Sequence, residues 1–268
     1  MQVNVPFAGY YSQPNYHTEL ETQLLFGEEV TVIEELPVLC KVQSGLYRTP
    51  GYVETKSLRQ TLYSPTHRVM WPLVNVYLRA DFKSPNLQTL AMNSLLSLRE
   101  STHTPEGIML KFDGVGWIFA NEVMLDSAAK DSDYVELLLR YVNLPYTWGG
   151  VYFPDCSGMV QQALRPRLKQ CFRNCSDLIQ LGMEADTDAR TLMRGDMVFF
   201  MNGKSRHVVV MVDGVNCVHA SILNRRVLVE PLVNVMRAQR EAKYGTGEIS
   251  AVRRFPWYQH ERLKRLVA

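Results

Sequence analysis

The sequence predicts an α+β protein in which two small β-barrels precede a region of helices and antiparallel strands. Three observations predict this class. Short strand-like runs separated by turns fill the first ~125 residues, and one strand pattern occurs twice within them. Helix signals begin only after residue 126, and further strand signals follow the helices instead of alternating with them.

An internal repeat indicates the two barrels. Gly51-Tyr52-Val53 and Gly116-Trp117-Ile118 are both Gly-aromatic-β-branched runs, and an aliphatic residue stands seven positions after each glycine. Their spacing of about 65 residues fits one small barrel for each copy. A turn-rich stretch around Pro65 separates the copies, so we expect one barrel over residues 1–62 and another over residues 63–126.

Residues 127–268 are expected to hold the helices and a sheet. Asp133-x-x-Glu136 resembles a capping box, and the apolar spacing from Val135 to Val142 predicts an amphipathic helix. Asp155 can cap a second helix over residues 156–164, and a short third helix is expected over residues 176–181. Strands are expected at residues 197–201, 207–212, 216–220 and 227–229.

Composition and charge exclude several classes of function. The net charge of +2 leaves no strong electrostatic footprint for nucleic acid. No apolar run approaches the ~20 residues of a membrane helix, so we expect no membrane insertion. The first ten residues show neither the basic nor the apolar part of a signal peptide, which favours a cytoplasmic protein, with a periplasmic or exported one as the alternative. The sequence indicates no particular oligomeric state.

The five cysteines are too few and too scattered for a disulfide scaffold. Cys171 and Cys175 form a C-x3-C pair, but no second pair follows, so we expect no zinc or other metal. Cys40 and Cys217 lie in aliphatic, strand-like runs, and we interpret both as buried structural thiols.

Cys156 is the candidate nucleophile. It opens the second expected helix, where unpaired backbone N–H groups and the helix dipole lower the pKa of a thiol. Ser157 and Gly158 are small and leave the sulfur accessible, and the N–H of Cys156 can face an oxyanion. The alternative is that this cysteine is simply a buried residue at a helix start.

Two histidines stand on neighbouring expected strands, with Asp213-Gly214 between them as a turn. A loop over residues 212–214 places His207 directly opposite His219 on the same face of the sheet. A strict two-residue turn places them on opposite faces instead. In the first register, one imidazole can take the thiol proton while the other orients it. The alternative is that both are exposed residues at strand ends.

Five ordered motifs stand between residues ~130 and 255: Tyr146-Thr147-Trp148-Gly149-Gly150, Asp155-Cys156-Ser157-Gly158, Arg194-Gly195-Asp196-Met197-Val198-Phe199-Phe200, His207-Val208 and His219-Ala220-Ser221. Their order and spacing resemble those of the NlpC/P60 cysteine peptidases. The front half is similar to bacterial SH3-like domains through Thr22-Gln23, Phe26-Gly27-Glu28 and Gly51-Tyr52-Val53. Two such domains before a catalytic domain is the arrangement of the dipeptidyl-peptidase VI-type members of that family.

The resemblance implies a papain-like α+β catalytic domain over residues 127–268 behind two SH3-like β-barrels. It implies hydrolysis of the γ-D-glutamyl–meso-diaminopimelate bond of peptidoglycan stem peptides through a thioester, without a cofactor. Carried over by position, Cys156 is the nucleophile, His207 the base and His219 the orienting third residue. The positions expected to contact substrate in this domain are Tyr146, Trp148, Asp155 and Ser157.

The resemblance also gives the first barrel a role. In relatives specific for a free N-terminal L-Ala, an acidic residue and a tyrosine of this barrel close the cleft, and Glu19 and Tyr52 look like those positions. Alternatively, Glu19 is barrel surface and Tyr52 barrel core. Relatives often carry Arg-Asp-Ser after the second helix. Here Asn174 and Cys175 occupy the two substrate-contacting positions of that motif, without its charge or its hydroxyl.

Two other functions fit the same residues. One is an amidase or acyltransferase with the same Cys–His pair, although the lipid-acyltransferase relatives place His before Cys in the chain. The other is a module that binds cell-wall peptide through its barrels and has an inactive catalytic domain. The presence of Cys156, His207 and His219 together argues against the inactive domain.

Overall fold

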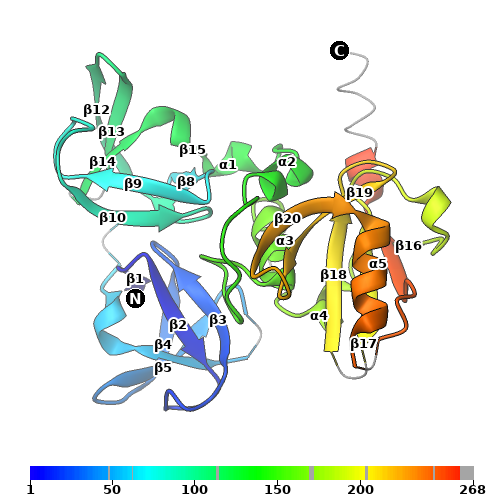
Figure 1. Cartoon of the computed structure of the whole chain (residues 1–268). Coiled ribbons are helices and arrows are strands. Elements are labelled where there is room, and N and C mark those ends of the chain that lie inside the picture. Colours follow the sequence, from blue (N-terminus) through cyan, green and yellow to red (C-terminus); the bar gives the residue numbers. More distant parts are fainter. Residues whose placement is uncertain are drawn as a thin grey trace. The chain divides into compact units, whose positions relative to one another are not determined.

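The computed structural model describes residues 1–47, 49–61, 63–112, 115–168, 172–202, 205–243 and 245–259 (Figure 1). The chain divides into two compact units. The first contains Met1–Ser132, Gly149–Tyr152 and the described part of Leu164–Cys171. The second contains Asp133–Trp148, Phe153–Ala163 and the described chain from Phe172 onward. The expected boundaries at residues 62 and 126 remain a prediction.

The first barrel is a five-stranded antiparallel sheet with the order β3-β2-β6-β5-β4. Its strands are β2 (Phe7–Tyr11), β3 (Leu20–Leu25), β4 (Val30–Glu35), β5 (Leu39–Ser44) and β6 (Gly51–Glu54). Two short paired strands, β1 (Gln2–Val3) and β7 (Leu58–Arg59), belong to the same barrel. Alternating side chains such as Leu24, Val42 and Val53 form its buried core.

The second barrel repeats this strand order as β10-β9-β14-β13-β12. Its strands are β9 (Leu73–Tyr77), β10 (Asn86–Ala91), β12 (Leu98–Thr104), β13 (Gly107–Phe112) and β14 (Gly116–Phe119). A three-stranded sheet of β8 (His67–Val69), β11 (Leu95–Leu96) and β15 (Val123–Leu125) completes it. The identical order confirms the tandem repeat that the two Gly-aromatic-β-branched runs predicted.

The repeated glycines have a steric reason. In both copies the glycine begins a strand that leads through a 3-10 turn, Thr55–Ser57 or Ala120–Glu122, into a short final strand. A Cβ added at Gly51 would lie 2.1 Å from Cε1 of Tyr10, and one added at Gly116 would lie 2.5 Å from Cγ1 of Val76. Both positions therefore need glycine because a neighbouring strand's side chain fills the space.

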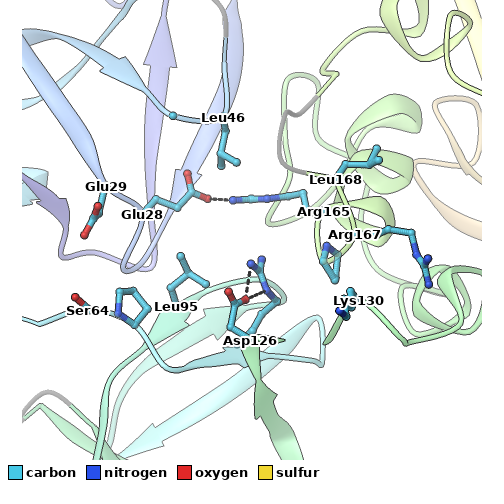
Figure 2. A pocket seen from close by; sticks show the side chains of 14 residues that line it. Glu28, Glu29, Leu46, Ser64, Leu95, Asp126, Lys130, Arg165, Arg167 and Leu168 are labelled. Carbon is cyan, nitrogen blue, oxygen red and sulfur yellow. Dashed lines mark hydrogen bonds and ion pairs between the residues drawn. The ribbon is translucent and has the colours of Figure 1, made fainter. Parts of the chain in front are cut away.

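Two ion pairs line a pocket of about 680 Å³ in the first unit (Figure 2). Arg165 pairs with Glu28, and each side chain is only 2% exposed. Arg68 pairs with Asp126 at 2.6 Å, next to the four-residue helix α1 (Asp126–Ala129). The Arg165–Glu28 pair attaches the segment that follows residue 164 to the first barrel, since a buried charge needs its partner.

The segment before residue 153 is attached to the same unit through Gln23. The side-chain oxygen of Gln23 accepts hydrogen bonds from the backbone N–H groups of Val151, at 2.9 Å, and Tyr152, at 3.0 Å. Gly149 has a positive φ of 71°, and a Cβ there would lie 2.1 Å from the carbonyl oxygen of Leu20. Only glycine allows this close approach of two backbones.

The second unit is built on a six-stranded antiparallel sheet with the order β16-β21-β17-β18-β19-β20. Its strands are β16 (Met183–Ala185), β17 (Met197–Asn202), β18 (Ser205–Met211), β19 (Asn216–Ser221), β20 (Arg226–Pro231) and β21 (Ala251–Arg254). Its helices are α2 (Tyr134–Leu139), α3 (Cys156–Leu164), α4 (Cys175–Leu178) and α5 (Leu232–Glu241). α5 lies against one face of the sheet (Figure 1). Its Leu232 and Val235 belong to the core cluster on that face. No helix among the described residues is long and apolar enough to span a membrane.

The four expected strands and the first two expected helices are confirmed, and so is the α+β class. Three details were wrong. The first helix ends at Leu139, before Val142, the last residue of its expected apolar stripe. The third helix begins at Cys175 and ends at Leu178, earlier than expected at both ends. Asp133 does cap α2 through the N–H groups of Val135 and Glu136, but the Glu136 carboxylate binds Arg194 instead of completing a capping box.

The Arg194-Gly195-Asp196 motif has a structural role in this unit. Arg194 bonds the hydroxyl of Tyr258 at 2.9 Å, and the fully buried Asp196 pairs with Arg254 at 2.7 Å. Gly195 has a φ of 88°, and an added Cβ there would lie 2.3 Å from the Tyr258 ring. The motif thus joins α2, the sheet and the segment after β21.

Candidate active site

Cys156 is the first residue of α3 and is half-buried. The helix begins here because Asp155 caps it, as its sequence position predicted: Oδ1 accepts the N–H of Gly158 at 2.7 Å. The thiol therefore lies in the first turn, beside backbone N–H groups that lack partners within the helix.

Arg173 clamps this helix start to the segment before α4. It donates to Oδ1 of Asp155 at 3.0 Å and to Oδ2 at 2.6 Å, and also to the Ser157 hydroxyl at 3.0 Å. The side chains of Arg173 and Asp155 are each 9% exposed. Asp155 and Ser157 are thus buried and bound to an arginine, and their contact with substrate stays a prediction.

The clamp places a second thiol beside the first. Sγ of Cys175, at the start of α4, lies 3.9 Å from Sγ of Cys156, and Cys175 is 7% exposed. Asn174, at the N-cap of α4, is exposed and makes no side-chain cap bond. Cys171, the other half of the C-x3-C pair, lies outside the described residues.

The histidine pairing was predicted correctly for the face and wrongly for the register. Val210 pairs with Val218 and Met211 with Cys217, and the connection runs over residues 212–215. His207 therefore does not lie directly opposite His219. The two are diagonal neighbours on the face that α5 covers, since side chains alternate along each strand.

A hydrogen-bonded line runs from His207 to a carboxylate. Nε2 of His207 lies 2.9 Å from Nδ1 of His219, and Nε2 of His219 lies 2.9 Å from Oε1 of Glu230. A carboxylate only accepts, so neutral His219 donates from Nε2 to Glu230 and accepts at Nδ1 from His207. This leaves Nδ1 of His207 as the nitrogen that can accept a proton from Cys156.

Burial and the charge of His207 lower the pKa of His219 to about 4, although the bond to Glu230 opposes the shift. His219 is therefore neutral at neutral pH, as the hydrogen-bond assignment requires. Glu230 was not among the residues picked out from the sequence. The one sequence signal for Glu230 is its position two residues after Leu228, on the strand that follows His219. Its closeness to His219 depends on the strand register, which pairs His219 with Leu228 and Cys217 with Glu230 and is seen only in the fold.

The pKa of Cys156 lies well below its ordinary value. The largest cause is a hydrogen bond with Cys175, followed by a hydrogen bond with His207 and the charge of that imidazole, while burial opposes them. The pKa of Cys175 is raised by the same hydrogen bond and by its own burial. The proton of the pair therefore stays on Cys175, and Cys156 is the thiolate.

A pocket of about 180 Å³ opens onto these groups, with walls that include Tyr146, Cys156, His207, His219 and Glu230. Burial and the charge of Cys156 raise the pKa of Tyr146, so its phenol stays protonated and can donate. Apolar side chains with high exposure also line the pocket: Trp148 at 58%, Ile222 at 60% and Leu223 at 71%. The pocket offers a nucleophile, a base and an apolar rim suited to a peptide.

Glu19 and Tyr52 belong to the first compact unit. Glu19 is exposed and directly precedes β3. Tyr52 lies on β6, is half-buried, and has Nζ of Lys41 5.8 Å from its ring centroid. Their expected part in amine recognition stays a prediction. Among the described residues, no group of three or more His, Cys, Asp or Glu side chains could hold a metal ion.

Comparison with known proteins agrees with this fold and site. The sequence profile of the NlpC/P60 family matches residues 143–245, and that of the bacterial dipeptidyl-peptidase SH3 domain matches residues 10–58. The chain thus carries an NlpC/P60 peptidase domain, which follows a bacterial SH3 domain in the sequence.

Two curated relatives align with most of the chain. The dipeptidyl-peptidase 6 of Lysinibacillus sphaericus is 25% identical over 84% of this chain and 89% of its own length. The gamma-D-glutamyl-L-lysine dipeptidyl-peptidase of Bacillus cereus is 26% identical over 80% of this chain and 71% of its own. A crystal structure of an NlpC/P60 family protein from Bacillus cereus, 20% identical, shares the fold with a TM-score of 0.73, covering 95% of this chain and 98% of that one.

Proposed function

We propose that this protein is a cysteine peptidase that hydrolyses the γ-D-glutamyl–meso-diaminopimelate bond of peptidoglycan stem peptides. The observation that supports it most is the line from Cys156 through His207 and His219 to Glu230 at the wall of one pocket. A thiolate at a helix start beside an oriented imidazole is the arrangement of cysteine nucleophiles. The dipeptidyl-peptidase relatives support the class of substrate.

In the proposed reaction the thiolate of Cys156 attacks the γ-glutamyl carbonyl carbon. Backbone N–H groups at the start of α3, with the Tyr146 hydroxyl, stabilise the oxyanion. Protonated His207 then gives its Nδ1 proton to the departing amine, and a thioester remains on Cys156. His207 next takes a proton from water, which attacks the thioester and releases the acid. His219 and Glu230 hold the His207 ring and its tautomer throughout.

We also propose that the substrate carries a free N-terminal L-Ala, whose ammonium group the carboxylate of Glu19 would bind with Tyr52 beside it. Asn174 and Cys175 add no charge to such a subsite, so the recognition would rest on Glu19. A requirement for a free amine would direct the enzyme to released muropeptides, because muramic acid blocks that amine in the intact wall.

The test is mass spectrometry of the products that the purified protein forms from L-Ala-γ-D-Glu-meso-diaminopimelate. The same peptide with an N-acetyl group, and the analogue with L-lysine at the third position, run in parallel. The control is Cys156→Ala. Cleavage after γ-D-Glu by wild type, and not by Cys156→Ala, supports the proposed peptidase activity. Cleavage of the acetylated peptide at an equal rate would remove amine recognition, and no cleavage of any peptide would reject the proposed bond.

A further inference from the structure

The pair of thiols at the active site is unusual for the role proposed above. Where the resemblance leads us to expect a serine, Cys175 places a second sulfur 3.9 Å from that of Cys156. Each thiol belongs to the first residue of a helix, α3 or α4, and the two residues are nineteen positions apart in the chain. This arrangement puts two groups that can be oxidised together next to the pocket.

The backbone around the pair is held in place. Arg173, two residues before Cys175, binds Asp155, the residue before Cys156, through two hydrogen bonds at 3.0 and 2.6 Å. A disulfide needs a sulfur–sulfur distance of about 2.05 Å. The sulfurs therefore have to approach by roughly 2 Å, a movement of the size that a change in side-chain rotamers produces.

The two sulfurs differ in access and in charge. Cys156 is half-buried and lines the pocket of about 180 Å³, so a small oxidant reaches it. It is also the thiolate of the pair, and the thiolate is the form that reacts with peroxides. Cys175 is 7% exposed and keeps its proton, so it reacts only through its neighbour.

We propose that Cys156 and Cys175 form a site of reversible oxidation, in which a hydroperoxide converts the two thiols into a disulfide. The thiolate of Cys156 attacks the peroxide oxygen and becomes a sulfenic acid, and with one proton the other oxygen leaves as water or alcohol. The Cys175 sulfur then attacks the Cys156 sulfur, which releases water and forms the S–S bond. Two thiols are oxidised and one peroxide is reduced, and a dithiol reverses the reaction by exchange.

The disulfide would stop any chemistry that needs the Cys156 thiolate. It would also keep that sulfur from reaching the sulfinic acid, which reductants do not reverse. Two other thiols are poorly placed to compete. Cys40 is 1% exposed in the core of the first barrel, and Cys217 is fully buried under α5.

The test is peptide mapping of the full-length protein after treatment with hydrogen peroxide, with tryptic digestion and no reduction. Trypsin separates the three cysteines near the site, because Arg173 lies between Cys171 and Cys175. We expect residues 141–167 linked to residues 174–190, with a mass lower by two hydrogen atoms than the sum of the two peptides. Dithiothreitol should remove the link and restore activity.

Two variants make the result specific. In Cys175→Ala, Cys156 should pass to the sulfinic acid, and dithiothreitol should not restore the free thiol. In Cys171→Ala, the link should form as in wild type. The proposal is overturned if wild-type Cys156 is found as sulfinic acid without the link, or linked to residues 170–173. Mapping needs no substrate, so this result is independent of the proposed peptidase activity.

Discussion

Oε1 of Glu230 lies 2.9 Å from Nε2 of His219, and this contact determines which nitrogen of the ring carries the proton. Because the carboxylate accepts the Nε2 proton, Nδ1 faces His207 as an acceptor. A side chain at the end of the line thereby sets the tautomer of the imidazole that faces the nucleophile.

Replacing this carboxylate tests its effect on the tautomer. In Glu230→Ala, His219 is free to carry its proton on Nδ1. That N–H would point at the N–H of His207, and the hydrogen bond between the two rings would be lost. We therefore expect kcat to fall by roughly 10²–10⁴-fold with KM little changed. In Glu230→Gln, the amide oxygen still accepts, and the loss should stay within about tenfold. Steady-state kinetics on the tripeptide give both numbers. Glu184→Gln, whose side chain is 83% exposed, is the control. Equal kcat values for Glu230→Ala and wild type would contradict the assignment.

The buried His219 makes stability depend on pH. Its pKa falls from 6.5 to about 4 on folding, so between these values the unfolded chain binds a proton that the folded protein does not. This contribution is fully present above about pH 6.5 and is lost as the pH falls toward about 4. It amounts to about 3 kcal/mol of unfolding free energy.

Urea unfolding at pH 7.5 and pH 4.5 measures this effect. His219→Gln removes the titrating group, so its free energy of unfolding should fall less between the two pH values than that of wild type. An equal fall in both proteins would show that other groups carry the dependence.

The clamp between Arg173 and Asp155 should dominate the local stability. Arg173→Gln leaves a buried carboxylate without its charged partner, which costs roughly 3–5 kcal/mol of unfolding free energy. The matched control is Arg190→Gln, which breaks an arginine–aspartate pair whose arginine side chain is 89% exposed, and it should leave the urea midpoint unchanged. Similar midpoints for the two variants would mean that Asp155 finds another partner.

The glycine of the first repeat is predicted to be sterically required. In Gly51→Ala the new methyl group meets the Tyr10 ring, which cannot retreat because it is buried and its hydroxyl donates to the carbonyl of Thr49 at 2.8 Å. We expect a loss of about 1–3 kcal/mol in unfolding free energy. Gly45→Ala is the control, since an added Cβ there has no heavy atom within 4 Å. Thermal unfolding of both variants decides the point.

The sequence predicted the elements that local patterns define. The repeat around Gly51 and Gly116 predicted two barrels, and the cap at Asp155 predicted the helix that begins with Cys156. The alternation of strands near His207 and His219 placed both rings on one face even though the assumed loop was too short. These features depend on residues close together in the chain, which is why they could be seen.

The missed elements depend on distant partners or weak patterns. β16 is a three-residue, largely exposed strand that exists because Met183 pairs with Arg254. α5 buries only Leu232 and Val235 among its ten residues, so its apolar stripe is thin. Neither the 3.9 Å contact of the two thiols nor the reach of Arg173 to Asp155 has any signature in spacing.

The attachments of Gln23 and Glu28 limit how such a protein can be assembled by recombination. Gln23 holds the backbone at residues 151 and 152, and Glu28 holds Arg165, so the first barrel binds the chain shortly before and shortly after α3. A gene fusion that replaced this barrel with an unrelated module would remove the buried carboxylate of Glu28 that pairs with Arg165. An exchange of the first barrel therefore has to preserve both attachments, because residues 149–152 and the described part of 164–171 belong to the same compact unit as the barrel.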